Sequence, residues 1–313
     1  MRSGLKAETH MAHERQTTIS RKVSCAGVGV HSGARARLTL LPATTHTGIR
    51  FVRVDVPAGT GEIQAHAEAV SDTQLGTTLS NKHGVSVAVV EHLLAAIAGL
   101  GIDNLWIEID GTEVPIMDGS SSVFYELLMQ AGQKAQAAAR QRIRILETVE
   151  VREGPKRATL SPSNSDVLTL RTRIEYDDQH IGVQQMAMKL APGMFARDLA
   201  FARTYGFARD VEMLRAMGLA RGGSLENAVV IGEDGVMNPE GLRIEDEFVR
   251  HKMLDAVGDL MLAGAPIAGD YDAVQPGHSL NNKLVRKLLA TPSAWCWEEA
   301  GTQEVHEDVR AAI

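Results

Sequence analysis

The chain has 313 residues, of which 44% are hydrophobic and 23% charged, so it can bury a sizeable core in one large domain or two of ordinary size. Its formal net charge of −7 argues against general attraction to nucleic acid or to an anionic membrane surface. Cys25 and Cys296 are too few for a disulfide framework or a cysteine-rich zinc site, and no apolar run reaches membrane-spanning length. These features predict a reduced cytoplasmic protein without stable membrane insertion.

The ends and the middle of the chain suggest its organisation. Residues 1–20 are polar and lack the apolar segment of a secretory signal, and we expect residues 1–15 to be a disordered extension. Residues 302–313 read as a loosely ordered tail. A polar segment rich in Ala, Gln and Lys at 133–141 is interpreted as a linker between two α+β domains. These domains are predicted over residues 16–135 and 142–301.

The first half reads as short strands followed by helices. Glu91 and His92 follow a β-branched run and precede an apolar helix over residues 93–100, and such junctions often carry functional side chains. His31 lies in a glycine-flanked turn, where we expect it to be held by hydrogen bonds rather than to bind a ligand. A turn before residue 123 offers Ser120 or Ser121 as a helix cap. The strands expected from alternation and β-branched content are 34–41, 48–54, 84–90 and 104–109.

The second half shows the same order without any sequence repeat. Its last part contains a loop at 275–283 that holds His278, followed by a helix to about residue 290. The other elements predicted from the pattern are strands at 142–152, 157–161, 167–176 and 228–231 and helices at 211–217 and 247–262.

The helix predicted over residues 247–262 carries a polar row. His251, Asp255 and Asp259 are each four residues apart and therefore share one face, opposite an apolar stripe. A His and a carboxylate one turn apart can bind one divalent metal from the same side. Alone, this spacing is more often a simple hydrogen-bonded pair, so its meaning depends on the rest of the chain.

Together, the candidate residues assign every role that metal-assisted amide hydrolysis requires. His92, His251 and Asp255 provide three ligands and leave a fourth position for water, as in catalytic zinc sites. Glu91, next to a ligand, is placed to act as the general base. His278 can stabilise an oxyanion or protonate the leaving amine. Asp259 can hold the imidazole of that residue protonated.

Motifs along nearly the whole chain, from about residue 16 to 289, resemble one family. They resemble the UDP-3-O-acyl-N-acetylglucosamine deacetylases, the zinc amidases of lipid A biosynthesis in Gram-negative bacteria. The motifs are V-G-V-H-S-G (28–33), V-E-H-L-x-A-A-x-A-G-L-G-I-D-N (90–104), P-I-M-D-G-S (115–120), A-R-T-Y-G-F (202–207), G-G-S (222–224), E-D-E-F-V-R-H-K-M-L-D-A-V-G-D-L (245–260) and G-H-S-L-N-N-K (277–283).

The resemblance implies a cytoplasmic enzyme, which we expect to be a monomer. It would remove the acetyl group from UDP-3-O-(3-hydroxyacyl)-N-acetylglucosamine, using Zn²⁺ bound by His92, His251 and Asp255. It implies that Glu91 is the base and His278 the acid or oxyanion partner. The implied fold is α+β, with two β-α-α-β layered domains that each carry a small insert.

Further roles also follow only from the resemblance. Thr204 matches the residue whose hydroxyl contacts the carbonyl oxygen of the substrate. Lys252 matches a lysine that binds the substrate, and Asp259 matches the carboxylate behind the catalytic histidine. The insert at about 204–234 resembles the passage for the fatty-acyl chain. The remaining residues expected at the substrate are Tyr205, Val211, Ala220 and Val230.

The sequence departs from the family pattern at two positions, and two other functions remain as alternatives. Relatives often carry Cys near Gly76 and Phe at the position of Tyr205. One rival is a zinc hydrolase acting on another amide, whose rate would not depend on the 3-O-acyl group. The other is a binding protein with a structural metal, which would need four protein ligands.

Overall fold

The computed structural model describes residues 14–300, and its main framework is two five-stranded sheets. The mixed composition of strands and helices confirms the predicted α+β class. The first sheet has the order β2 (Val23–Val28), β3 (Arg35–Pro42), β9 (Leu105–Ile109), β4 (Ile49–Arg53), β5 (Glu62–Gln64). The second has the order β12 (Val149–Glu153), β13 (Lys156–Ser161), β20 (Asp270–Val274), β14 (Thr169–Glu175), β15 (Val183–Lys189).

The two sheets repeat one topology. In each sheet, a hairpin pairs antiparallel with a strand that comes late in that half of the chain. The late strand pairs parallel with the third strand of the same sheet in chain order. A second hairpin completes each sheet. The chain therefore carries a structural repeat although no sequence repeat is visible, because hydrophobic alternation and turns fix a sheet without requiring the same residues.

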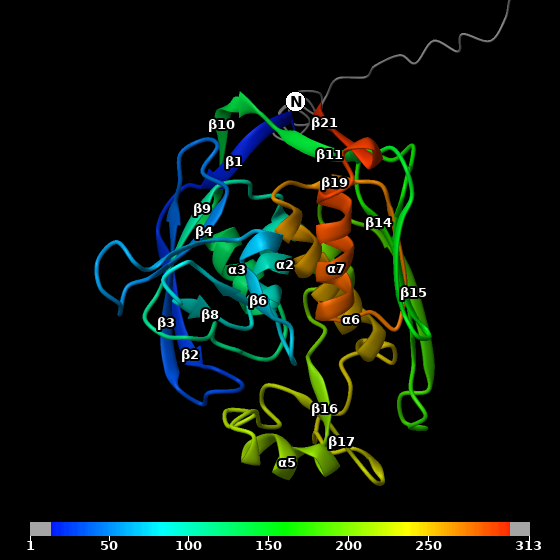
Figure 1. Ribbon diagram of the computed structural model, residues 1–313. Helices are drawn as coiled ribbons and strands as arrows, with labels where there is room; N and C mark the ends of the chain where they lie inside the picture. Colours follow the sequence, from blue (N-terminus) through cyan, green and yellow to red (C-terminus); the bar gives the residue numbers. More distant parts are fainter. Residues whose placement is uncertain (1–13, 301–313) are drawn as a thin grey trace, which may run out of the picture.

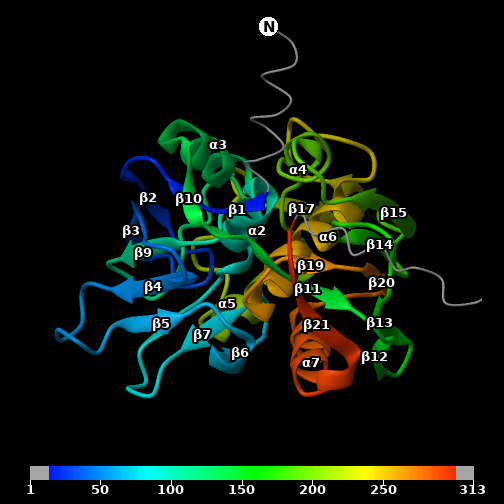
Figure 2. The ribbon, with the colours of Figure 1, turned by 90° about the horizontal axis from the view of Figure 1, so that it is seen from above.

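Four helices fill the space between the sheets, which form the two outer layers (Figure 2). Helices α2 and α6 pack directly against each other at the centre. Their surfaces are almost wholly buried, which explains why the sequence of α2 is apolar all round. The helices are α2 (Glu91–Leu100), α3 (Ser122–Ala131), α6 (Glu247–Leu260) and α7 (His278–Leu289).

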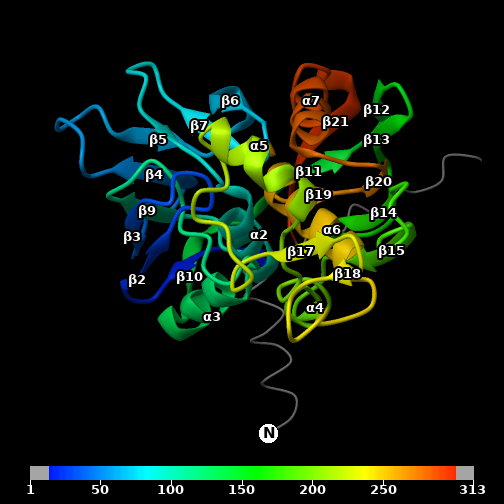
Figure 3. The same ribbon diagram turned by 90° about the horizontal axis from the view of Figure 1, so that it is seen from below.

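Each half contains an insert between its last sheet hairpin and its first long helix. The second insert projects from the framework, and in the view from below its helix α5 lies between the two halves (Figure 3). The first insert comprises a 3₁₀ turn at Ala67–Ala69, β6 (Val70–Asp72), β7 (Thr78–Ser80) and β8 (Ser86–Val87). The second comprises α4 (Met194–Asp198), β16 (Tyr205–Phe207), a 3₁₀ turn at Ala208–Asp210, α5 (Val211–Ala216), β17 (Val229–Gly232) and β18 (Gly235–Val236).

Smaller sheets close the end of the molecule where the chain passes between its halves (Figure 1). Strand β1 (Arg15–Ile19) pairs with β10 (Gln133–Ala139), and β11 (Gln141–Ile145) lies between β19 (Ile267–Ala268) and β21 (Trp295–Glu299). Short 3₁₀ turns at Met261–Ala263 and Pro292–Ala294 flank these last strands. Among residues 14–300, no helix is long and apolar enough to cross a membrane.

Several local predictions need correction. Most of the segment predicted as a linker at 133–141 is regular structure, because residues 133–139 form strand β10, which pairs with β1. The strand predicted at 142–152 is two strands, β11 and β12, in different sheets. His278 is not in a loop but is the first residue of α7. The predictions for residues 1–15 and 302–313 lie outside the described residues, except for Glu14 and Arg15, and Arg15 begins β1.

Candidate metal centre and active site

The candidate site lies where α2 and α6 cross. A Cβ added to Gly258 of α6 would lie only 2.1 Å from the carbonyl oxygen of Glu91, so glycine lets the two backbones touch. Just before α2, Val89 adopts φ of +57°, a strained conformation for a β-branched residue, and turns the chain into the helix. The crossing brings the first turn of α2 against the middle of α6.

His92, His251 and Asp255 form a buried group that can hold a metal ion. One donor atom from each lies within 4.8 Å of the others. The Nε2 atoms of His92 and His251 are 3.5 and 3.3 Å from Asp255 Oδ1. That carboxylate oxygen is buried and has no hydrogen-bond partner among the described residues. A buried charged oxygen without a donor is costly, so a cation between the three donors fits this site.

The protonation of the ligands suits metal binding. Burial, with help from the positive charges of Lys252 and His92, lowers the pKa of His251 to about 3 although Asp255 opposes this, so the imidazole is neutral at pH 7. Its Nδ1 donates to the carbonyl oxygen of Ala202 at 3.0 Å, which leaves Nε2 as the lone-pair donor. Burial alone would raise the pKa of Asp255, but His251 and Lys252 hold it well below its usual range.

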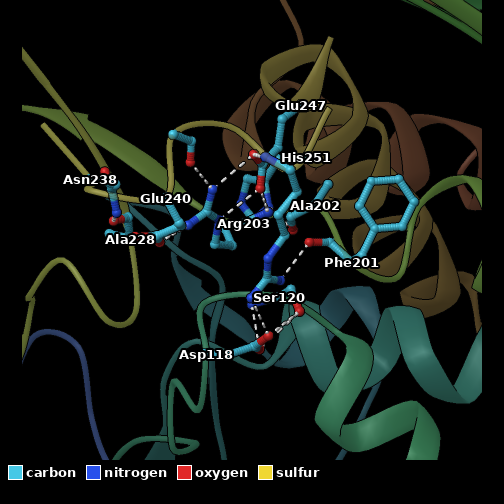
Figure 4. A network of polar contacts seen from close by, with 12 residues as sticks. Asp118, Ser120, Phe201, Ala202, Arg203, Ala228, Asn238, Glu240, Glu247 and His251 are labelled. Atoms are coloured by element: carbon cyan, nitrogen blue, oxygen red, sulfur yellow. Dashed lines mark hydrogen bonds and ion pairs between the residues drawn. The ribbon is translucent and has the colours of Figure 1, made fainter. Parts of the chain in front are cut away.

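A buried ion pair supports the carbonyl group that orients His251. Arg203 is only 2% exposed, and its backbone N and side-chain Nε both donate to Glu247 Oε1, at 3.0 and 2.8 Å. Glu247 lies one turn before His251 on α6, so this ion pair connects the segment at Ala202 to the helix that carries His251 and Asp255 (Figure 4). Such groups behind a ligand fix its tautomer and direction.

Glu91 lies beside this group with its carboxylate held in place. The backbone N–H of Thr77 donates to Glu91 Oε2 at 2.9 Å, and His278 Nε2 lies 3.8 Å from Oε1. Burial raises the pKa of Glu91 above its usual value, although the charges of His278 and His92 oppose this. A carboxylate with a raised pKa is a stronger base, as proton abstraction from water requires.

His278 faces Glu91 as a cation. Its Nδ1 donates to Asp259 Oδ2 at 3.0 Å, and the same oxygen accepts from Asn281 at 2.9 Å. The hydroxyl of Tyr271 in turn donates to Asn281 Oδ1 at 2.7 Å. Burial disfavours the charge, but Asp259 and Glu91 outweigh it and raise the pKa of His278 to about 10. The ring therefore presents a protonated Nε2 towards Glu91.

Comparison with known proteins identifies the family. The family model described as UDP-3-O-acyl N-acetylglycosamine deacetylase matches residues 16–290. The chain belongs to this family. A UDP-3-O-acyl-N-acetylglucosamine deacetylase of Phenylobacterium zucineum is 50% identical over 280 residues, covering 90% of this chain and 95% of the relative. Relatives of the same name from Myxococcus xanthus (50% identical, 90% and 88% covered) and Shewanella frigidimarina (47% identical, 90% and 91% covered) are similar to it. The family resemblance carried by the motifs is thus confirmed.

Lys252 and Tyr205, expected at the substrate in this family, lie next to the candidate metal ligands. Lys252 Nζ donates to Asp255 Oδ2 at 2.8 Å and lies 5.6 Å from the centre of the Tyr205 ring. Tyr205 packs edge-on against Phe248 and bonds through its hydroxyl to Tyr176 at 3.0 Å. In the sequence, Thr204 lies between Ala202 and Tyr205, which both contact His251. The backbone N–H of Thr204 donates to the carbonyl oxygen of Gly119 at 2.8 Å.

The three residues expected to line the acyl passage are all half-buried on the second insert. Helix α5, which begins at Val211, has no buried residue. Strand β17 turns Val229 and Ile231 into a small core with Phe248, so Val230 faces the other way. Ala220 has φ of +51° and its N–H points at the His31 ring, at 3.4 Å, so the insert touches the first half there.

Sequence reasoning missed the residues that hold the site from behind. Arg203 and Glu247 stood within recognised motifs but had no assigned role, and a buried pair of opposite charge cannot be read from residues 44 positions apart. Thr77 stands in a polar loop with no motif of its own. His31, expected to be held by hydrogen bonds in its turn, lies 3.0 Å from the carbonyl oxygen of Leu75 through Nε2, as expected.

Proposed function

We propose that this protein removes the N-acetyl group of UDP-3-O-(3-hydroxyacyl)-N-acetylglucosamine, the committed step of lipid A biosynthesis, at a zinc ion held by His92, His251 and Asp255. The observation that carries the proposal is the pairing of a buried His-His-Asp group with Glu91 on one side and a protonated His278 beside it. Two imidazoles and one carboxylate are a common ligand set of catalytic zinc and leave a position for water. A zinc ion held by these residues would lower the pKa of a water in that position and would polarise the amide carbonyl.

The residues of the chain then divide the proton transfers. Glu91 takes a proton from the water whose oxygen forms a bond to the carbonyl carbon. As the amide C–N bond breaks, the nitrogen needs a proton, and the products are acetate and the free amine. The protonated Nε2 of His278 can supply this proton. If Nε2 instead donates a hydrogen bond to the carbonyl oxygen as the charge of that oxygen grows, the nitrogen receives the proton that Glu91 took from water. Thr204 is proposed to donate to the same oxygen, and Asp259 to keep the imidazole charged.

The binding roles complete the proposal. Lys252 supplies a local cation for the anionic diphosphate, which a chain of net charge −7 otherwise repels. Tyr205 and the half-buried residues Val211, Ala220 and Val230 are proposed to enclose the acyl chain, and an insert helix with no buried residue fits this use. We further propose a monomer acting in the cytoplasm.

The deciding experiment measures metal content and acetate release together. The purified protein should contain about one zinc per chain and release acetate from UDP-3-O-(3-hydroxyacyl)-N-acetylglucosamine. Glu91→Gln should keep the metal and lose about 10²–10⁴-fold in kcat. Equal rates on a substrate that lacks the 3-O-acyl group would favour the rival, a zinc hydrolase of another amide. Loss of the metal in Glu91→Gln would show that Glu91 serves the metal site and is not the base.

A further inference from the structure

Thr77 contacts both catalytic carboxyl groups at once. It lies in the loop between β6 and β7 of the first insert and is 1% exposed. Its backbone N–H donates to Glu91 Oε2 at 2.9 Å, and its hydroxyl donates to Asp259 Oδ1 at 2.6 Å. One residue therefore joins the proposed base, on α2, to the carboxylate behind the proposed acid, on α6.

The contact with Glu91 fixes the direction of the base. Because Oε2 is occupied by the Thr77 amide, Oε1 is the oxygen that faces His278, at 3.8 Å. The loop is itself tied to the start of α2, since the N–H of Val90 donates to the carbonyl oxygen of Thr77 at 3.2 Å. The backbone of Thr77 and the carboxylate of Glu91 are thus held as one unit.

The contact with Asp259 fixes the direction of the acid. His278 and Asn281 both bond to Oδ2 of Asp259, so the Thr77 hydroxyl is the donor to Oδ1 among the described residues. Without it, a buried carboxylate oxygen has no donor, and the carboxylate is free to rotate towards another. The imidazole of His278 would follow, because its Nδ1 is bonded to that carboxylate.

We propose that Thr77 is a positioning residue that holds the base Glu91 and the Asp259–His278 pair at the separation that proton transfer needs. The inference rests on the proposed deacetylase function. It assigns to the hydroxyl a kinetic role, distinct from a role in stability. Misplacing a reacting group by about 1 Å can cost about 10²-fold in rate, whereas substrate binding, which uses other groups, should stay unchanged.

The test compares three substitutions of Thr77 in the metal-loaded, full-length protein. Thr77→Val removes the hydroxyl and keeps the backbone amide, and it should lower kcat for acetate release by about 10–100-fold with KM and zinc content unchanged. Thr77→Ala does the same without a methyl group that could crowd Asp259, and it replaces the valine variant if that one does not fold. Thr77→Ser restores the hydroxyl and should recover most of the rate.

A matched control and a double variant separate positioning from stability. Thr172→Val removes another buried hydroxyl, one that has no hydrogen-bond partner within residues 14–300, and should leave kcat unchanged. In a His278→Ala background, Thr77→Val should have little further effect, because the two act through one path. Full kcat in Thr77→Val and Thr77→Ala, or a full additive loss in the double variant, would overturn the inference. An inactive wild-type protein would instead overturn the proposed function.

Discussion

Gly258 offers a sharp test of how the helix crossing sets the site. A methyl group added there would place its carbon, Cβ, 2.1 Å from the carbonyl oxygen of Glu91 and 3.0 Å from the Cα of Glu91. Ordinary contact begins at about 3.4 Å, so α2 and α6 must separate by roughly 1 Å, because backbone atoms cannot turn aside as a side chain can. Glu91 and His92 would move away from Asp255 by a similar amount.

The change should cost far more activity than stability. Overpacking of this kind costs about 1–3 kcal/mol, and the better helix propensity of Ala returns about 1 kcal/mol. The net loss of folding free energy is therefore about 0–2 kcal/mol. A shift of about 1 Å between base, ligands and acid should lower kcat by about 10²-fold, and the widened ligand group should hold zinc less tightly.

The assay measures kcat, zinc retention against a chelator and the free energy of unfolding for Gly258→Ala. Gly99→Ala is the matched control, because it also adds a methyl group to a central helix, in this case α2. Its Cβ would lie 2.3 Å from the ring of Phe195, on a face that packs against α4. It should lose a similar amount of stability and keep the wild-type kcat. Wild-type kcat and zinc retention in Gly258→Ala would refute the claim that this contact sets the site.

Four other substitutions test separate parts of the proposal. His92→Ala should abolish chelator-resistant zinc, and retention of one zinc per chain by elemental analysis would remove His92 from the ligand set. Lys252→Ala should chiefly raise KM, and an unchanged KM and kcat would remove Lys252 from the site. Arg203→Lys should lower zinc affinity by about 10–100-fold, because lysine cannot reproduce the paired bonds behind Ala202; unchanged affinity in a chelator titration would contradict that role. Val230→Phe should lower kcat/KM for long acyl chains far more than for short ones, each lost methylene being worth up to about 0.8 kcal/mol; an equal shift at every length would place Val230 outside the passage. Val230 is a better choice than Ala220, whose positive φ adds strain to any larger side chain.

The parts of the site that follow local periodicity could be predicted from the sequence. The four-residue spacing of His251, Asp255 and Asp259 placed them on one face of a helix, and the structure has them there on α6. The junction at Glu91 and His92 is the start of α2. The distance between the two helices could not be predicted, because it depends on Gly258 and on packing between residues far apart in the chain. That Glu91 and His92 lie beside His251 and Asp255 was predicted only from the family motifs.

The misses have physical causes as well. The sequence of β10, QKAQAAA, favours helix or coil, and only pairing with β1, more than a hundred residues earlier, makes it a strand. The polar row of α6 was expected opposite an apolar stripe, but all three of its members are buried. Burying them is tolerable because each charge has partners in other elements, such as Thr77 for Asp259, and no local pattern records such partners.

The structural repeat explains why the residues of the proposed site gather at the centre and why both halves of the chain are needed to form it. Helices α2 and α6 hold equivalent places in the two halves and meet face to face, so whatever residues they carry at the crossing are brought together. The scaffold is symmetric in topology, yet the chemistry is not. Residues 14–139 contribute Glu91 and His92, whereas His251, Asp255 and His278 come from residues 141–300. Two of the three proposed metal ligands and the proposed acid lie in one half, and the remaining proposed ligand and the proposed base lie in the other. Neither half alone therefore holds all the groups of the proposed site.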